Sequence, residues 1–188
     1  MGSILLALCA IGIWSSLAVL STKVSHLPPL FSVGLALCVG GLAGAFRARD
    51  WRVPLLTFAI GVGGIFGYHF LLFTAFRSAP AVEANLLNYL WPLLIVVLSP
   101  LFLPGLALGL RHVAGAILGL AGAVMIVSGG RLSPDLSHLG GYLLAAAAAL
   151  VWACYSLLTK RVRPFSTGAV GGFCLASGLL SLCSFGLE

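Results

Sequence analysis

Residues 54–75 read PLLTFAIGVGGIFGYHFLLFTA, a stretch that contains no Asp, Glu, Lys or Arg. An α-helix rises about 1.5 Å per residue, so a helix of roughly 20 apolar residues crosses the ~30 Å hydrocarbon layer of a bilayer. The length and composition of this stretch therefore predict a transmembrane helix.

Apolar stretches of similar length recur along the whole chain. Hydrophobic residues make up 61% of the 188 positions, charged residues make up 7%, and the mean hydropathy is +1.15. A soluble domain of this size could not bury so much apolar surface. The predicted fold class is an all-α integral membrane protein, a bundle of about seven transmembrane helices. The other predicted spans are 4–22, 30–46, 82–103, 112–129, 140–159 and 168–186.

The basic residues lie in the linkers between the apolar stretches, which sets the predicted orientation. Lysine and arginine are enriched in the cytoplasmic loops of membrane proteins. The linkers after the second, fourth and sixth spans hold seven of them, against three in the other linkers, so we expect a cytoplasmic N-terminus and the plasma (inner) membrane. The net charge of +6 is spread over linkers and forms no continuous face, so the expected partner is the lipid bilayer and not nucleic acid.

The sequence carries no pattern typical of an enzyme or a metal site. Neither a G-x-S-x-G nor an H-E-x-x-H motif occurs. The five cysteines all fall in apolar stretches and form no C-x-x-C pair. We therefore predict no catalytic residue, no metal and no cofactor.

Small residues repeat at a spacing that is typical of close helix packing in membranes. Gly40 and Gly44 lie four residues apart in one predicted span, and Gly115 and Gly119 do so in another. Small residues at this spacing let two helix backbones approach closely. We expect both pairs to be packing surfaces.

The span 82–103 holds the most informative polar residues. Pro92 has no amide hydrogen, so the carbonyl of Asn88 loses its helical partner and a helix kink is expected at Pro92. Four residues of this span fall within about 60° of helix arc and form a polar stripe: Asn85, Asn88, Tyr89 and Pro92. This polar stripe faces either neighbouring helices or a water-filled cavity, so it is either a structural kink or the lining of a site.

Several ring-bearing residues lie near the middle of other spans. His69 is predicted at nearly the same depth as Tyr89, and a membrane-embedded imidazole indicates either a functional site or a hydrogen bond between helices. Trp152 and Tyr155 share one face of the span 140–159, where they either pack or line a pocket. Trp91 lies about 110° of helix arc away from the polar stripe, so geometry alone gives less support to Trp91 than to Trp152 as a site residue.

Residues 4–24 and 142–162 indicate an internal repeat. Aligned without gaps, they match at seven of 21 positions, including Trp14 with Trp152. A repeat unit of five helices would make the second copy inverted, as in many secondary transporters with a substrate site at the repeat interface. We expect a first five-helix repeat in residues 1–138 and the first two helices of a second in 139–188, as a fragment of a ten-helix (5+5) protein.

The segments PAVEANLLNYLWPLL (80–94) and GAILGLAGAVMIVSGG (115–130) resemble the EamA type of the drug/metabolite transporter superfamily. Within that superfamily, the sequence is most similar to the YddG-type aromatic amino-acid exporters. The residues that carry this similarity are Tyr68-His69, Asn88 to Pro92 and Trp152. The resemblance implies a ten-helix inner-membrane exporter of aromatic amino acids and related amphiphiles that works by alternating access. It also implies a substrate site of Tyr68, His69, Asn88, Tyr89, Trp91, Trp152 and Tyr155. A Glu that many EamA repeats carry after the fourth span is absent from LPGLALGLRH (103–112).

The preferred functional hypothesis is a secondary transporter for a small-molecule substrate. No Asp or Glu lies in the middle of a predicted span, which favours facilitated export or exchange over tight ion coupling. The alternatives are a structural or assembly subunit of the membrane, or an exporter of another metabolite or drug class. The sequence leaves the oligomeric state open.

Overall fold

The computed structural model describes residues 4–5, 8–9, 12, 27–128 and 136–186, and this part of the chain is helical without any strand. The predicted all-α fold class is confirmed. Six of the predicted spans correspond to helices, whereas the span 4–22 lies largely outside the described residues. The elements are α2 (Pro29–Ala43), η1 (Ala45–Trp51), α3 (Leu55–Ser78), α4 (Ala81–Asn88), α5 (Leu90–Phe102), α6 (Leu110–Ser128), η2 (Leu136–His138), α7 (Leu139–Leu158) and α8 (Ala169–Phe185).

Three described segments are long and apolar enough to cross a membrane alone. They are α3, the pair α4–α5 taken from Ala81 to Phe102, and η2 with α7 from Leu136 to Leu158. The pair α2 and η1 would count as a fourth, but η1 turns away from α2 by 86°. The prediction that one span continues to residue 46 is therefore wrong at that end, since α2 stops at Ala43.

Prolines set the boundaries of the central helices. Pro54 precedes α3, with a φ of −53° that suits a helix start. Pro80 disfavours helical geometry at the residue before it, and Ala79 is extended, with φ −150° and ψ 158°. The chain therefore leaves α3 after Ser78 and re-enters a helix at Ala81.

The predicted span 82–103 consists of two helices that meet at Tyr89. The amide of Tyr89 still donates hydrogen bonds to the carbonyls of Asn85 (3.1 Å) and Leu86 (3.2 Å). Three residues later, Pro92 has no hydrogen to offer the carbonyl of Asn88. The interruption thus lies one turn before Pro92, next to the Asn88 carbonyl that would accept a hydrogen bond from residue 92 in a regular helix.

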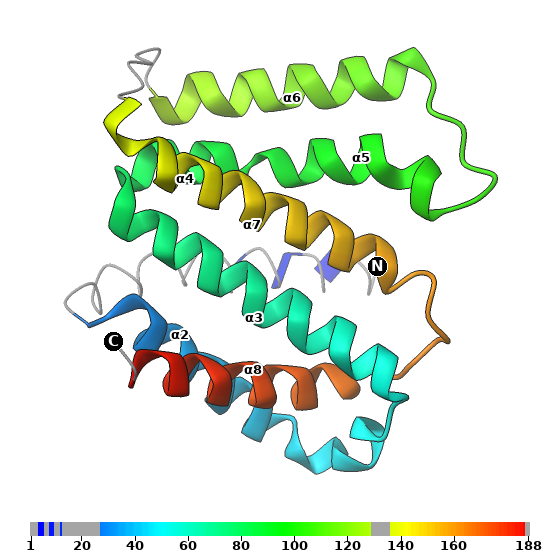
Figure 1. Cartoon of the computed structure of the whole chain (residues 1–188). Coiled ribbons are helices and arrows are strands. Elements are labelled where there is room, and N and C mark those ends of the chain that lie inside the picture. Colours follow the sequence, from blue (N-terminus) through cyan, green and yellow to red (C-terminus); the bar gives the residue numbers. More distant parts are fainter. Residues whose placement is uncertain (1–3, 6–7, 10–11, 13–26, 129–135, 187–188) are drawn as a thin grey trace.

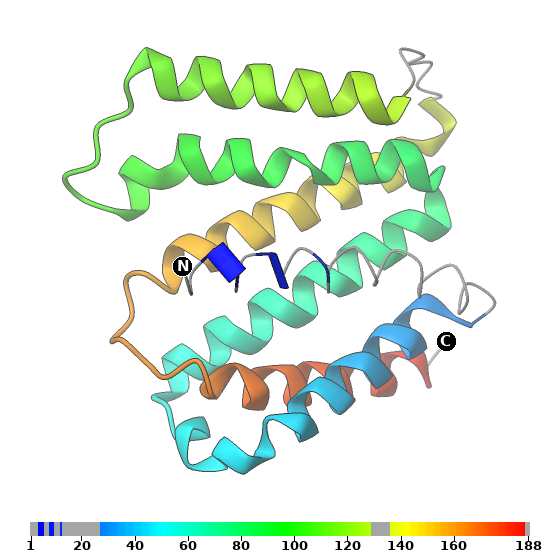
Figure 2. The same ribbon diagram turned by 180° about the vertical axis from the view of Figure 1, so that it is seen from behind.

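The helices form a layered bundle with α3 and α7 packed side by side in its middle (Figure 1). On one side α2 packs on α8, and α8 packs on α3. On the other side α4 and α5 pack on α7, and α6 packs on α5 at the edge. Figure 2 shows the same order from behind, with η1 and the linkers α5–α6 and α7–α8 at one end of the bundle. Most linker arginines therefore share one end.

Most of the glycines that lie in close helix contacts are not the ones predicted from the sequence. A Cβ atom at Gly41 would lie 2.8 Å from the carbonyl oxygen of Gly171, so α2 and α8 touch backbone to backbone. Gly44 also faces Gly171, whereas Gly40 meets nothing within 4 Å. Gly115 and Gly119 face open space as well, because α6 lies at the edge of the bundle. Among the described residues, Gly40, Gly115 and Gly119 therefore make no close helix contact.

Candidate functional site

Four ring-bearing side chains of α3 and α7 form a continuous group, here called the aromatic cluster. The ring centroids of Tyr68 on α3 and Trp152 on α7 lie 4.9 Å apart. Tyr155 continues the group on α7, 5.4 Å from Trp152, and His69 continues it on α3, 5.0 Å from Tyr68. These separations fall in the range at which aromatic rings attract one another. All four members were candidates from the sequence, and all four are partly accessible.

Asn88 joins the aromatic cluster from the end of α4. Its side-chain Nδ2 donates a hydrogen bond of 3.1 Å to the Tyr68 hydroxyl oxygen. The residue is only 5% exposed, and its Oδ1 is buried without a hydrogen-bond partner among the described residues. A buried polar atom without a partner costs about 1–3 kcal/mol. An unpaired acceptor of this kind is suited to receive a donor from a bound molecule.

His69 makes its hydrogen bond within its own helix. Its Nδ1 lies 2.7 Å from the carbonyl oxygen of Ile65, which accepts but cannot donate, so Nδ1 carries the hydrogen. In the neutral ring Nε2 is then an acceptor. The expectation of a hydrogen bond between helices is not met in the described structure. The imidazole ring also stacks on Phe73, with centroids 6.3 Å apart and planes 13° from parallel.

The other candidates lie outside the aromatic cluster. Tyr89 is 41% exposed and Trp91 is partly buried, and neither ring contacts another ring within the described parts of the chain. Pro92 is exposed, whereas Asn88 is buried. The residues of the predicted polar stripe therefore differ in exposure, from the buried Asn88 to the exposed Tyr89 and Pro92.

A row of glycines on α3 positions the rings of the neighbouring helices. A Cβ atom at Gly64 would lie 2.4 Å from ring carbons of Tyr155, and one at Gly61 would lie 2.5 Å from the ring of Phe173. Gly67 faces Val151 one turn further along. Sequence reasoning missed these contacts, although the i, i+3, i+6 spacing of Gly61, Gly64 and Gly67 was visible as a small-residue face.

Phe73 also lies next to the aromatic cluster, although the sequence did not predict it as a site residue. It stacks on His69 and meets Phe76 edge-on at 5.6 Å, so it extends the aromatic surface along α3. Phenylalanine is common throughout the apolar stretches, with 11 in the chain. Its position four residues after His69 was the only available signal.

Glu83 is held at the opposite end of α4 from Asn88. The hydroxyl of Tyr142 on α7 donates a hydrogen bond to its carboxylate, and His138 Nδ1 lies 3.2 Å from the carbonyl oxygen of Ser78. These contacts tie the start of α7 to the α3–α4 turn. Glu83 therefore braces the end of the bundle and does not reach the aromatic cluster.

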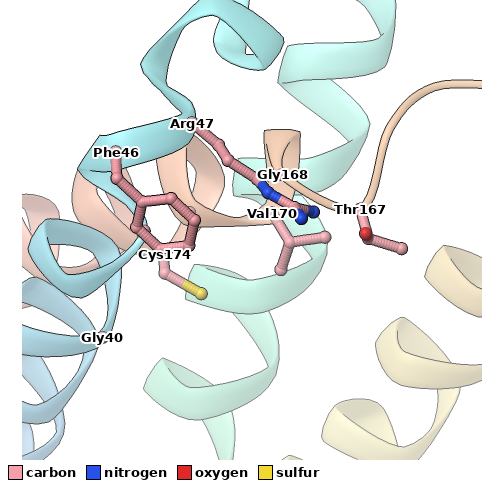
Figure 3. A pocket seen from close by; sticks show the side chains of 9 residues that line it. Gly40, Phe46, Arg47, Thr167, Gly168, Val170 and Cys174 are labelled. Atoms are coloured by element: carbon pink, nitrogen blue, oxygen red, sulfur yellow. The ribbon is translucent and has the colours of Figure 1, made fainter.

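Two cavities lie away from the aromatic cluster, at the end of the bundle that carries η1. One, of about 310 Å³, lies between α2 and α8 and is lined by Phe46, Arg47, Thr167 and Cys174, among others (Figure 3). The other, of about 410 Å³, lies between residues 49–54 and 163–166. Neither is lined by a residue of the aromatic cluster.

The comparisons with known proteins point to one family. Residues 1–128 match the model of the EamA-like transporter family. The chain is 42% identical over 191 residues to the aromatic amino acid exporter YddG of Ancylobacter novellus, covering 95% of this chain and 66% of that protein. It is 27% identical to a probable amino-acid metabolite efflux pump of Salmonella typhimurium, covering 96% of this chain and 61% of the pump.

The fold is shared with a solved protein as well. A crystal structure at 42% sequence identity superposes with a TM-score of 0.86, covering 98% of this chain and 67% of the solved one. The chain thus spans about two thirds of the length of the relatives that it matches. The family model and these relatives are transporters and not enzymes. The chain therefore belongs to the EamA-like transporter family of integral membrane proteins.

Proposed function

We propose that this chain exports aromatic amino acids and related small metabolites across the inner membrane. The similarity to an aromatic amino acid exporter and to a probable amino-acid metabolite efflux pump supports export of amino-acid-like solutes. The aromatic cluster with the unpaired Asn88 Oδ1 is the observation that carries the proposal.

The chemistry of the aromatic cluster suits an aromatic zwitterion. A substrate ring would stack against Trp152 and Tyr155, with centroid distances similar to the 5.4 Å between these two rings. Its ammonium group would donate a hydrogen bond to Asn88 Oδ1, and the neutral His69 would offer Nε2 as a second acceptor. A solute without a ring would gain the polar contacts but lose the stacking.

The proposed site also lies where the proposed repeats meet. Tyr68, His69 and Asn88 belong to residues 1–138, the proposed first repeat, whereas Trp152 and Tyr155 belong to residues 139–188. Inverted-repeat transporters bind substrate at the repeat interface, and one repeat rocks against the other. We infer that export proceeds by alternating access around the contact between α3 and α7.

We further propose that the end of the bundle with η1 faces the cytoplasm. Arg47, Arg49 and Arg52 lie at this end, as do Arg111 at the start of α6 and a run of basic residues from Lys160 in the α7–α8 linker. This concentration agrees with the bias of cytoplasmic loops towards basic residues. With the span predicted for residues 4–22, this orientation agrees with the cytoplasmic N-terminus expected from the sequence.

Efflux from proteoliposomes tests the proposal. The full-length protein is reconstituted with radiolabelled L-phenylalanine or L-leucine inside, and Trp152→Ala is compared with Leu150→Ala, a truncation to alanine at an exposed position of the same helix. Loss of one aromatic contact of 0.5–1.5 kcal/mol, with the burial that accompanies it, predicts phenylalanine efflux at least about fivefold slower for Trp152→Ala.

The control Leu150→Ala should keep wild-type rates, and both variants should reach the membrane in wild-type amounts. Equal efflux of phenylalanine by Trp152→Ala and wild type would count against the site. Absence of efflux of any amino acid by the wild-type protein would count against the proposed function and favour a structural role.

A further inference from the structure

The cavity of about 410 Å³ at the η1 end is lined by three arginines and is called the arginine pocket here. Arg49 and Arg52 come from η1 and the residue after it, and Arg163 comes from the linker between α7 and α8. The two segments are more than 100 positions apart in the sequence, so the fold alone brings these guanidinium groups to one cavity. None of them belongs to the proposed substrate site.

The three guanidinium groups outnumber the one carboxylate that lines the pocket. All three side chains are exposed, and none forms an ion pair with a carboxylate in the part of the chain that the structure describes. The one acidic residue that lines the pocket, Asp50, accepts a hydrogen bond of 2.6 Å from the Ser166 hydroxyl. The pocket therefore carries an excess of positive charge.

The carboxylate of Asp50 is held in a structural position at the start of α8. A Cβ atom at Gly168 would lie 2.4 Å from Asp50 Oδ2, so the carboxylate packs directly against the residue before the helix. The Gly168 amide in turn donates a hydrogen bond of 3.2 Å to Ser166 Oγ. A negative group at a helix N-terminus is electrostatically favourable. Asp50 and Ser166 thus join η1 to the α7–α8 linker and fix the spacing of the arginines.

Besides the arginines, Asp50 and Ser166, the arginine pocket has four apolar lining residues. Val53, Pro54, Pro164 and Phe165 line it beside the arginines. The other cavity, between α2 and α8, is lined by Phe46, Val170 and Cys174, among others (Figure 3). Guanidinium groups beside apolar side chains are complementary to a phosphate group that is attached to a hydrophobic chain.

We propose that the arginine pocket binds a phosphate group, such as the phosphodiester of an anionic phospholipid or a free phosphate ester. Guanidinium groups bind phosphate oxygens in a bidentate manner, which gives both strength and geometry. Basic pockets between helices at the cytoplasmic membrane surface are suited to anionic headgroups. The apolar wall favours the lipid as the source of the phosphate.

Binding to the purified full-length protein in a neutral detergent tests this proposal. The probes are short-chain phosphatidylglycerol, short-chain phosphatidylcholine and glycerol 3-phosphate, and the readout is the dissociation constant of each. The test variant carries Arg52→Gln and Arg163→Gln. The control is Arg111→Gln, an exposed arginine at the same end of the bundle that does not line the pocket.

Each arginine near a phosphate contributes enough that its loss weakens binding about fivefold, so the double variant should bind phosphatidylglycerol about 25-fold more weakly. Arg111→Gln should bind as the wild type does. Binding of phosphatidylglycerol but not of glycerol 3-phosphate would identify the lipid as the ligand, and equal binding of both would identify the free ester. Equal affinity of the double variant and the wild type, or equal binding of the zwitterionic and anionic lipids, would overturn the proposal.

Discussion

Gly64→Ala should separate α3 from α7 and destabilise the protein. The new methyl carbon would lie 2.4 Å from the Tyr155 ring carbons and 2.6 Å from the Tyr155 Cβ atom. Because the Cβ atom itself is too close, rotating the ring cannot relieve the overlap, and the two helices have to move apart. Overpacking of a tight contact costs about 1–3 kcal/mol, which sets the expected loss in the free energy of unfolding.

Reversible unfolding of the full-length protein in mixed micelles measures this loss. Gly63→Ala is the matched control, since a Cβ atom there meets nothing within 4 Å. It should be neutral or stabilise the helix by up to about 1 kcal/mol, the ordinary gain when alanine replaces a helical glycine.

A double-mutant cycle identifies the cause of the destabilisation. Tyr155→Gly removes both the ring and the Cβ atom, so in this background Gly64→Ala should lose its penalty. The expected coupling is at least about 1 kcal/mol. A coupling within about 0.3 kcal/mol of zero, or equal effects of Gly63→Ala and Gly64→Ala, would refute the proposed tight contact.

Three further predictions concern the hydrogen bonds and the orientation. Tyr68→Phe removes the partner of Asn88 Nδ2 and should lower the free energy of unfolding by about 1–2 kcal/mol, and an unchanged value in the same assay would argue against the hydrogen bond. Tyr142→Phe removes the hydrogen bond to Glu83 and should cost about 1.5 kcal/mol, a loss that should vanish in a Glu83→Ala background if the bond is its cause. In a cysteine-free background, Arg161→Cys should react with an impermeant thiol reagent only from the cytoplasmic side, and Leu136→Cys only from outside; the reverse pattern would invert the proposed orientation.

The sequence predicts the helices well because bilayer thickness fixes both their length and their composition. The residue ranges of α3 and α7 agree with the predicted spans to within about three residues at each end. The helix ends at prolines were also accessible, since Pro54 and Pro80 act on the backbone locally. The 86° turn into η1 was not, because no proline lies between Ala43 and Ala45 to mark it.

The members of the aromatic cluster were predictable, but most of their contacts were not. Ring-bearing residues in mid-span stand out by composition, which is how His69 and Trp152 were found. The pairing of Tyr68 with Trp152 joins residues 84 positions apart, so it depends on how α3 and α7 pack. That packing is set by Gly64 and Gly67, and a small residue in the sequence does not identify which helix it faces. Gly115 and Gly119 show the same limit, because their spacing predicts a contact that the edge position of α6 does not provide.

Fluorescence of Trp152 as the only tryptophan tests most directly whether the aromatic cluster binds the substrate. The chain has three others, which would be replaced by phenylalanine (Trp14, Trp51 and Trp91) in a variant first shown to retain efflux. L-phenylalanine does not absorb at the wavelength that excites tryptophan, so a saturable change in emission on its addition reports an altered surrounding of Trp152. We expect such a change with L-phenylalanine and a much weaker one with L-leucine. An unchanged emission in a variant that still exports phenylalanine would contradict the account.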